Sequence, residues 1–399
     1  MKALLCALSV DLVFSVVSAN NIRVSNVILT NQDVVNNTYQ IQFDVAWDNS
    51  WRTSNLESNY DAAWIFVKYR VDPQVNWLHG IISTSGFVAP AGSTIFVPLE
   101  AASQGYGAFL QRSSNGIGNV NYTGVQIQWQ YATSFPDDAF VEVGVFAIEM
   151  VYIPGGSFFV GDGSPTPGAN FSSGSVISPF NITSESALTL GGTPSSNLGN
   201  SNGVGFGGPM DDFNSSVIQT LPATFPKGFD PFFVMKYEIS QCQYADFLNH
   251  ISPAAGAARF PNFTGSNNFN IDDNGVPPNT YVTSTPDRAC NYLSFADIAA
   301  YADWTALRPM SELEFEKICR GTRPALADEF AWGTPYIYNA VYAYLNSGQP
   351  NEMILNPPPG TGNALYTVTR GTPGPRRCGL AASSYPAPSR SEAGASYYG

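Results

Sequence analysis

The sequence predicts an α+β protein, with an N-terminal antiparallel β-sandwich followed by an irregular region that holds few regular elements. Residues 20 to about 148 alternate apolar and polar positions in short runs separated by Asn, Gly, Pro and Ser. Residues 164–220 are rich in Gly, Ser, Asn and Pro, a composition typical of an irregular insertion over the surface. After residue 230, three segments combine a Ser cap with helical apolar spacing.

The run "VQIQWQY" at 125–131 places four apolar side chains on one face and three glutamines on the other. Similar runs occupy residues 39–47, 63–71, 93–99 and 139–148. Several short strands with turn residues between them, and no helical pattern among them, predict a β-sandwich. The tryptophans of this region fit either a sugar-stacking platform or the sandwich core, and the core is the favoured interpretation; they are Trp47, Trp51, Trp64 and Trp77.

The pattern of the sequence changes near residue 150. There "MVYIPGGSFFVGDG" predicts two short strands joined at Pro154-Gly155-Gly156. We therefore predict a leader at 1–19, a β-sandwich domain at 20–148 and a second domain at 149–399 that contains the 164–220 insertion.

Three helices are predicted in the second domain, beginning after Ser240, Ser294 and Ser311. The third carries a capping box formed by Ser311 and Glu314, and Gly321 is placed to end it in the left-handed conformation. Its acidic residues lie toward the positive end of the helix dipole and its basic residues toward the negative end. The apolar positions are Leu313, Phe315, Ile318 and Cys319. We therefore expect the charges of this helix to be solvated and not catalytic.

Composition excludes several classes of partner. Only 12% of the residues are charged, the net charge is −13, and no basic stripe is present. Nucleic acid and anionic membrane surfaces are therefore not expected partners. Residues 1–19 combine a basic start, an apolar run and a small-residue cleavage site, which predicts a secretory leader. No other stretch approaches 18 apolar residues, so we expect a secreted or cell-surface protein without a transmembrane segment.

An exported chain makes disulfides an expectation. Cys6 lies in the leader, which leaves Cys242, Cys290, Cys319 and Cys378 as candidates for two bridges. Four cysteines allow three connectivities, and the sequence alone does not choose among them.

Two further patterns bear on metal sites. "NIDDNG" places Asn270, Asp272 and Asn274 before Gly275, like the opening of a calcium loop, although Tyr281 occupies the position of the usual glutamate. A turn with Asn274-Gly275 at its tip explains the same residues. The only two histidines, His79 and His250, fall in different predicted domains, so we expect neither a histidine-ligated metal nor a Ser-His-Asp triad.

Five motifs together resemble the sulfatase-modifying, formylglycine-generating enzyme family. In order they are "IPGGSFFVG" (153–161), "FFVMKYEISQCQYADFLN" (232–249), "NYLSFADIAAYADW" (291–304), "LRPMSELEFEKICRG" (307–321) and "FAWGT" (330–334). The fourth is similar to the family's Arg-Leu-Pro-Thr-Glu-Ala-Glu-Trp-Glu block. The resemblance implies a C-type-lectin-like fold for the second domain and covers roughly half of the chain.

The family contains copper-dependent oxidases, iron-dependent sulfoxide synthases and members that only bind ligands, so the resemblance does not fix the function. In the oxidases a cysteine pair lies near the C-terminal signatures, and we expect that region to lie beyond Gly399. None of the four cysteines matches that pair. The resemblance implies structural roles for Cys290 and Cys319, the latter in a disulfide, while Cys242 and Cys378 could pair with each other.

The favoured hypothesis is an exported, non-catalytic protein that uses its lectin-like domain to bind a protein or carbohydrate ligand or a partner subunit. An oxidase with its catalytic part outside this chain is one alternative, and copper would be its cofactor. The other alternative is a subunit that self-associates into an extracellular filament or layer. No cofactor other than calcium is indicated by the residues themselves.

Overall fold

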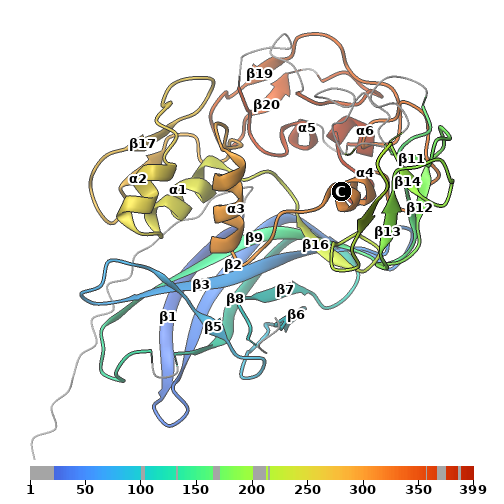
Figure 1. The fold of residues 1–399 in the computed structure, drawn as a ribbon. Helices are drawn as coiled ribbons and strands as arrows, with labels where there is room; N and C mark the ends of the chain where they lie inside the picture. Colours follow the sequence, from blue (N-terminus) through green and yellow to red (C-terminus); the bar gives the residue numbers. More distant parts are fainter. Residues whose placement is uncertain are drawn as a thin grey trace, which may run out of the picture. The chain divides into compact units, whose positions relative to one another are not determined.

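The computed structural model describes residues 22–99, 104–131, 134–164, 171–200, 213, 216–355, 357–365, 374–384 and 388–399. In these residues the chain is built mainly from antiparallel sheets with few helices, which confirms the predicted α+β class (Figure 1). It divides into two compact units. Unit 1 contains Met1–Arg52, Asp61–Met150 and Tyr237–Arg308, and unit 2 contains Thr53–Tyr60, Val151–Lys236 and Pro309–Gly399. The division at residues 148 and 149 stays a prediction.

Unit 1 contains two β-sheets. The first has the strand order β1-β2-β8-β5, with β1 Arg23–Asp33, β2 Thr38–Arg52, β5 Ile81–Ile82 and β8 Gly116–Gln130. The strands of unit 1 in the second sheet run β9-β3-β7-β6, and β4 pairs with β3; they are β3 Asp61–Val71, β4 Leu78–His79, β6 Ser93–Phe96, β7 Ala108–Arg112 and β9 Val141–Ile153, of which the residues after Met150 are assigned to unit 2. Each of the five predicted strand runs lies wholly or mostly in one of β2, β3, β6, β8 and β9.

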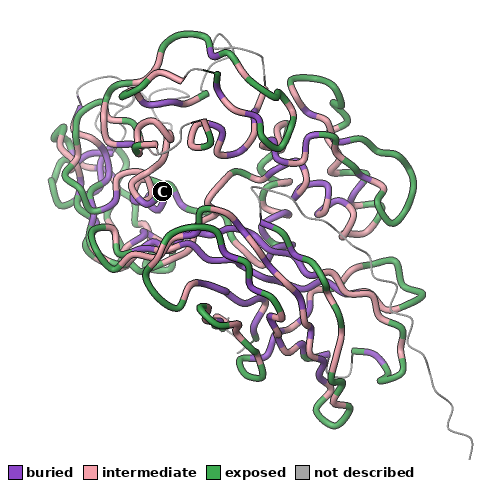
Figure 2. Tube along the Cα trace, turned by 180° about the vertical axis from the view of Figure 1, so that it is seen from behind, coloured by how far each residue is buried: buried purple, intermediate pink, exposed green. Residues whose placement is uncertain are grey.

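The two sheets share one hydrophobic core, and burial follows the strands (Figure 2). Val125, Ile127 and Trp129 of β8 are buried, while the glutamines between them are not, as the alternation predicted. Trp47 and Trp64 are 0% and 3% exposed, so these two are core residues. Trp51 and Trp77 are half-buried.

A buried carboxylate fixes the start of β3 against β2. Asp61 accepts hydrogen bonds from Trp47 Nε1 at 2.8 Å, Ser50 Oγ at 2.7 Å and the Trp51 amide at 3.0 Å. The two side chains and the peptide group therefore find partners inside the sandwich, where an unpaired polar group would be costly.

The helices of unit 1 begin where the caps predicted. α1 spans Gln241–Asn249 and α3 spans Phe295–Trp304, with capping boxes at Ser240 and Ser294. A helix that the periodicity did not indicate, α2 Pro253–Arg259, begins after Ser252 with Pro at its first position. The short strands β17 Ile271–Asp273 and β18 Tyr281–Thr283 form a hairpin beside α1.

Unit 2 is built from short elements. Strands β10 Phe158–Val160 and β12 Phe180–Ile182 pair, and a second sheet has the order β11-β14-β13-β15. The remaining elements are β11 Ser172–Ser173, β13 Leu188–Leu190, β14 Leu198–Gly199, β15 Gln219–Leu221, β16 Phe232–Met235, α4 Glu312–Arg320, β19 Ala343–Leu345, β20 Met353–Leu355, α5 Leu380–Ser383 and α6 Arg390–Ala393.

The described part of the 164–220 segment is more ordered than expected. Phe171, Phe180 and Leu198 are buried in one core with Leu313 of α4. The expectation of an irregular surface insertion is therefore wrong for these residues, because its scattered apolar residues pack inward on short strands.

Helix α4 has the predicted caps. Ser311 Oγ accepts from the Glu314 amide at 3.1 Å, and the Glu314 carboxylate accepts from the Ser311 amide at 2.8 Å. Gly321 ends the helix with φ 66°, and a Cβ at this position would lie 1.9 Å from the ring of Tyr397. Glycine is therefore required at this position by both its backbone conformation and its packing.

The prediction that the charges of α4 are solvated is wrong for two residues. Glu314 is 1% exposed and Lys317 0%, whereas the apolar Phe315 is 53% exposed. The face of the helix that points inward therefore differs from the apolar face expected from the sequence. Its buried charges meet polar backbone groups from a segment that is distant in the sequence.

That distant segment is the turn at 226–230. Lys317 Nζ donates to Gly228 O at 2.5 Å and lies 5.4 Å from the ring centroid of Phe158, and Ser311 Oγ donates to Pro226 O at 2.8 Å. Glu185 holds the same turn by accepting from the amides of Lys227, Phe229 and Asp230. Burial lowers the pKa of Lys317 to about 8, and the nearby carboxylates oppose that shift.

We predict that Asp61→Ala destabilises unit 1 by about 2–4 kcal/mol, because two buried side-chain donors and one partly buried amide lose their acceptor. Asp138→Ala, which removes an exposed carboxylate of the same unit, should change stability by less than about 0.5 kcal/mol. Thermal unfolding followed by tryptophan fluorescence measures both. Equal midpoints for the two variants would refute the role of Asp61.

For the cap of α4, we predict that Ser311→Ala destabilises unit 2 by about 1–2 kcal/mol, since the helix loses its cap and Pro226 O loses a donor. Ser311→Thr retains the hydroxyl and should recover most of that loss. Scanning calorimetry of the two variants provides the measurement, and identical transitions for alanine and threonine would contradict the prediction.

Candidate functional site

The proposed calcium residues lie on the β17–β18 hairpin. Asn270 Nδ2 donates to Thr285 Oγ1 at 3.1 Å, and Asn274 Oδ1 accepts from the Val276 amide at 2.8 Å. Gly275 adopts φ 67° next to Asn274. These bonds and this backbone fit the turn interpretation of the motif. Calcium binding through Asn270, Asp272 and Asn274 stays a prediction.

The structure does not contain the expected disulfides. All four cysteines stand outside disulfide bonds. Cys242 Sγ donates to Asp246 Oδ2 at 3.9 Å, and Cys290 Sγ donates to Asn291 O at 3.7 Å. Cys242 and Cys378, suggested as a pair, fall in different compact units.

The environment of the thiols bears on copper chemistry, which the resemblance associates with a cysteine pair. Burial raises the pKa of Cys290 well above its usual value and that of Cys319 to about 12. A metal is bound by the thiolate, so a metal that bound either of these thiols would have to displace its proton. In the part of the chain that the structure describes, no three His, Cys, Asp or Glu side chains are grouped to hold a metal ion.

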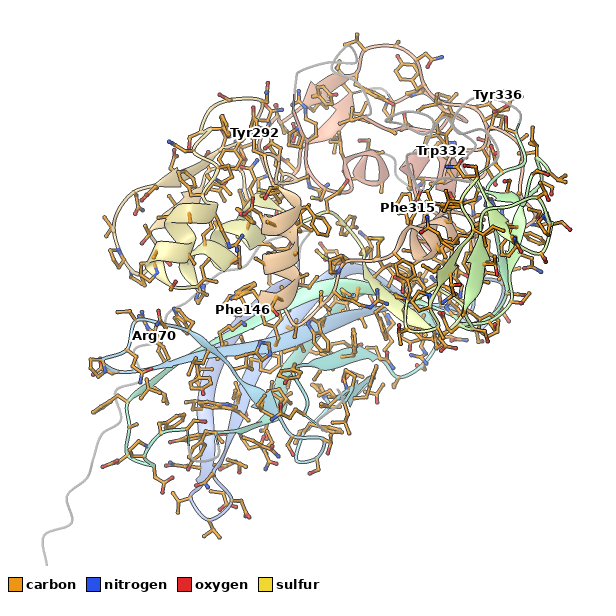
Figure 3. All side chains as sticks on the ribbon, in the orientation of Figure 1. Arg70, Phe146, Tyr292, Phe315, Trp332 and Tyr336 are labelled. Carbon is orange, nitrogen blue, oxygen red and sulfur yellow. The ribbon has the colours of Figure 1, made fainter. Side chains whose placement is uncertain are left out.

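Several titratable groups with shifted pKa values lie together in unit 1, around Trp304. We call this set the Trp304 cluster; its members are Phe66, Lys68, His79, Phe146, His250 and Trp304. Phe146, which is labelled in Figure 3, packs against both Trp304 and His250, and its ring centroid lies 5.0 Å from the first and 4.8 Å from the second. Both histidines of the sequence thus belong to one cluster in one compact unit, although they are far apart along the chain.

A hydrogen-bonded chain runs through the cluster. His79 Nε2 lies 2.5 Å from Tyr106 O, and His79 Nδ1 lies 2.9 Å from Lys68 Nζ. A carbonyl only accepts, so Nε2 carries the hydrogen of the neutral ring. Nδ1 is then the acceptor, and the Lys68 amine donates to it.

Desolvation has the largest effect on the pKa values of the hydrogen-bonded side chains of Lys68 and His79. Burial lowers the pKa of Lys68 to about 7, and the Asp303 charge opposes the shift. Burial, followed by the Lys68 charge, lowers the pKa of His79 to about 4. Near neutral pH the ring of His79 is therefore uncharged, and a substantial fraction of the Lys68 amine is uncharged too.

Helix α1 brings a second group of titratable side chains next to the cluster. His250 Nδ1 donates to Asp246 O at 2.7 Å, and burial lowers the pKa of its ring to about 4. Burial raises the pKa of Asp246 to about 7, against the hydrogen bond from Cys242. The Tyr301 hydroxyl of α3 is buried and has no hydrogen-bond partner among the residues that the structure describes. Such shifted values gather at functional sites more often than elsewhere.

The sequence contained one local signal for the cluster that we did not use. Lys68 interrupts the run "AWIFVKYRV", in which every residue from Ala63 to Tyr69 is buried. A lysine inside a strand buried on both faces needs a specific partner. The identity of that partner, His79, followed from the pairing of β3 with β4 and was not visible in the sequence.

Unit 2 presents aromatic side chains on the "FAWGT" motif. The rings of Phe330 and Trp332 stack with centroids 4.8 Å apart, and Trp332 Nε1 donates to Tyr336 O at 3.1 Å. Trp332 is buried, while Tyr336 is 69% exposed and Phe330 is at the surface. Figure 3 labels Trp332 and Tyr336 together with Phe315, the exposed aromatic residue of α4.

Comparison with known proteins gives one family and no individual relative. Residues 205–360 match the family model of the sulfatase-modifying factor enzyme 1-like domain. This range of the chain contains α1 to α4 and the "FAWGT" motif. No curated protein and no solved structure matches the chain. The match confirms the resemblance carried by the motifs of this region. The chain therefore contains a domain of the FGE-sulfatase family.

Proposed function

We propose that this is an exported protein that binds a ligand or a partner subunit through its FGE-sulfatase domain, without performing the oxidation known in part of that family. The observation that carries the proposal is the aromatic surface at residues 330–336, which begins with the "FAWGT" motif. Phe330 is partly exposed and Tyr336 is largely exposed, and both are positioned by the buried Trp332. Rigid, exposed aromatic rings are suited to stacking on sugars and to anchoring protein interfaces.

Backbone packing supports a preformed surface. Gly362 lies so close to Trp332 that a Cβ would be 2.1 Å from the indole ring. Arg390 donates through both Nε and Nη2 to Trp332 O, at 3.0 and 2.6 Å. A surface held in this way loses little conformational freedom on binding, which favours affinity.

The buried thiols support the non-catalytic part of the proposal. Cys290 and Cys319 have raised pKa values and each lies in a different compact unit. Buried, protonated thiols are inert compared with the thiolates that catalysis by cysteine uses.

Export rests on the leader at residues 1–19, which lies outside the described residues. No helix in the described ranges is long and apolar enough to cross a membrane. Secretion or display at the cell surface would expose the aromatic surface to glycans and to other proteins.

We predict that the mature protein binds a subset of an immobilised glycan array or self-associates, and that Tyr336→Ala reduces this binding at least about tenfold, the effect of losing one interface anchor. Glycan-array fluorescence and light scattering measure the two modes. Phe140→Ala, which removes a similarly exposed aromatic ring from unit 1, is the matched control and should leave binding unchanged.

The prediction that this chain itself performs no oxidation is tested on the same protein after loading with copper. An oxygen electrode should record no uptake with a cysteine-containing peptide above the rate of a protein-free copper control. Peptide-dependent oxygen uptake that Cys319→Ser or Cys290→Ser abolishes would overturn the proposal, as would a blank array with strictly monomeric protein.

A further inference from the structure

Two arginine side chains of unit 2 share one tyrosine ring. The guanidinium carbon of Arg323, just after α4, lies 5.0 Å from the ring centroid of Tyr397, and that of Arg390 on α6 lies 5.6 Å from the same centroid. The ring is fixed in place, because Gly321 leaves no room for a Cβ beside it and the Tyr397 amide donates to Cys319 O at 3.0 Å. Two like charges are therefore held at one rigid aromatic side chain.

The guanidinium group of Arg323 has no acidic partner within the described ranges. The residue is exposed, and its one contact there is the ring of Tyr397, with neither an ion pair nor a hydrogen bond. Other arginines of the chain do form ion pairs; they are Arg70, Arg259, Arg320 and Arg376. A guanidinium presents five N–H donors in one plane, so those of Arg323 are available to a ligand that arrives from solvent.

Arg390 connects this pair of charges to the aromatic surface at residues 330–336. Its Nε and Nη2 donate to Trp332 O, and a Cβ on Gly333 would clash with Nη2. Among the described residues, neither Nη1 of Arg390 nor the hydroxyl of Tyr397 has a hydrogen-bond partner. Unused donors therefore lie directly beside the loop that carries the exposed ring of Tyr336.

The repulsion between the two arginines is not cancelled by an adjacent carboxylate. Burial lowers the pKa of Arg390, the charge of Arg323 lowers it further, and Glu57 and Glu329 oppose these shifts. Glu329 is already paired with Arg320, and Glu57 forms no ion pair with either guanidinium in the part of the chain that the structure describes. Because arginine stays charged at physiological pH, an anion bound beside Tyr397 would relieve this repulsion.

We propose that the aromatic surface at residues 330–336 and the guanidinium groups of Arg323 and Arg390 form one binding site for acidic glycans. The inference rests on the proposed function and names the class of its ligand. A sugar ring stacks through its C–H face on Tyr336, and a carboxylate or sulfate ester of the same chain accepts hydrogen bonds beside Tyr397.

Two observations favour an acidic glycan over other anions. A glycan uses both halves of the site, since sugar rings stack on exposed aromatic rings while acid groups bind guanidinium ions. The net charge of −13 repels polyanions from the rest of the chain, so an acidic ligand gains most where two uncompensated cations lie together.

Fluorescence anisotropy with defined, labelled oligosaccharides tests the site on the mature protein. Hexagalacturonate supplies carboxylates, a carrageenan hexasaccharide supplies sulfate esters, and cellohexaose is the neutral control. We predict that one or both acidic probes bind at least about tenfold more tightly than cellohexaose, and that this preference falls as NaCl is raised from about 50 to about 500 mM. The acidic probe that binds identifies the acid group.

Variants assign the binding to the arginine pair. Arg323→Gln should weaken the acidic probe at least about tenfold, the effect of losing charge-assisted hydrogen bonds, and Tyr397→Phe should weaken it several-fold while keeping the ring. Both should leave the thermal midpoint of unit 2 nearly unchanged. Arg23→Gln removes another exposed arginine without an ion pair among the described residues, from β1 of unit 1, and is the matched control that should bind normally.

The outcomes separate this inference from the proposed function. Cellohexaose binding as tight as that of the acidic probes, acidic binding that Arg323→Gln leaves intact, or equally tight binding of poly-glutamate would each overturn the inference. If neutral glycans bind, or the protein self-associates, in a manner that Tyr336→Ala abolishes, the proposed function stands without it. Acidic binding that depends on Arg323 but survives Tyr336→Ala would keep the anion site and refute the role of the aromatic surface.

Discussion

The buried polar face of α4 is the constraint on which unit 2 depends. Lys317 and Ser311 bond to carbonyls of the turn at 226–230, and Glu185 accepts from the amides of the same turn. Gly228 makes the close approach possible, because a Cβ there would lie 3.3 Å from the Glu314 Cα. Polar groups from three parts of the sequence therefore satisfy one another in the interior, where none of them could remain unpaired without a large cost. The outer face of α4, including Phe315, is left available for contacts.

The two compact units use buried lysines in different ways. In unit 2, Lys317 is surrounded by carbonyl oxygen, and its pKa of about 8 keeps it largely charged near neutral pH. In unit 1, Lys68 has a neutral imidazole as its partner and a pKa of about 7. The first arrangement holds a turn against a helix, whereas the second joins the side chains of two paired strands, β3 and β4.

Local features of the fold were predictable from sequence because they depend on neighbouring residues. The three helix starts follow from Ser240, Ser294 and Ser311, and the strand at 125–131 follows from its alternation. Features that depend on distant partners were missed. The burial of Lys317 requires the turn at 228, and the meeting of His79 with Trp304 requires the packing of α3 against β3. The expectation of disulfides was based on the predicted export of the protein and on the family resemblance. Neither of these determines whether two cysteine side chains lie close enough to form a bond.

Native-state hydrogen exchange of α4 tests the buried polar layer most directly. The amides of Phe315 and Gly321 bond to Ser311 O and Lys317 O, at 3.0 and 2.7 Å. If the turn at 226–230 and α4 form one cooperative unit, these amides exchange only when unit 2 unfolds and belong to its slowest class. Exchange at the rate of the exposed turn amide of Gln349 would show that α4 opens locally, and would contradict the role assigned to its buried charges.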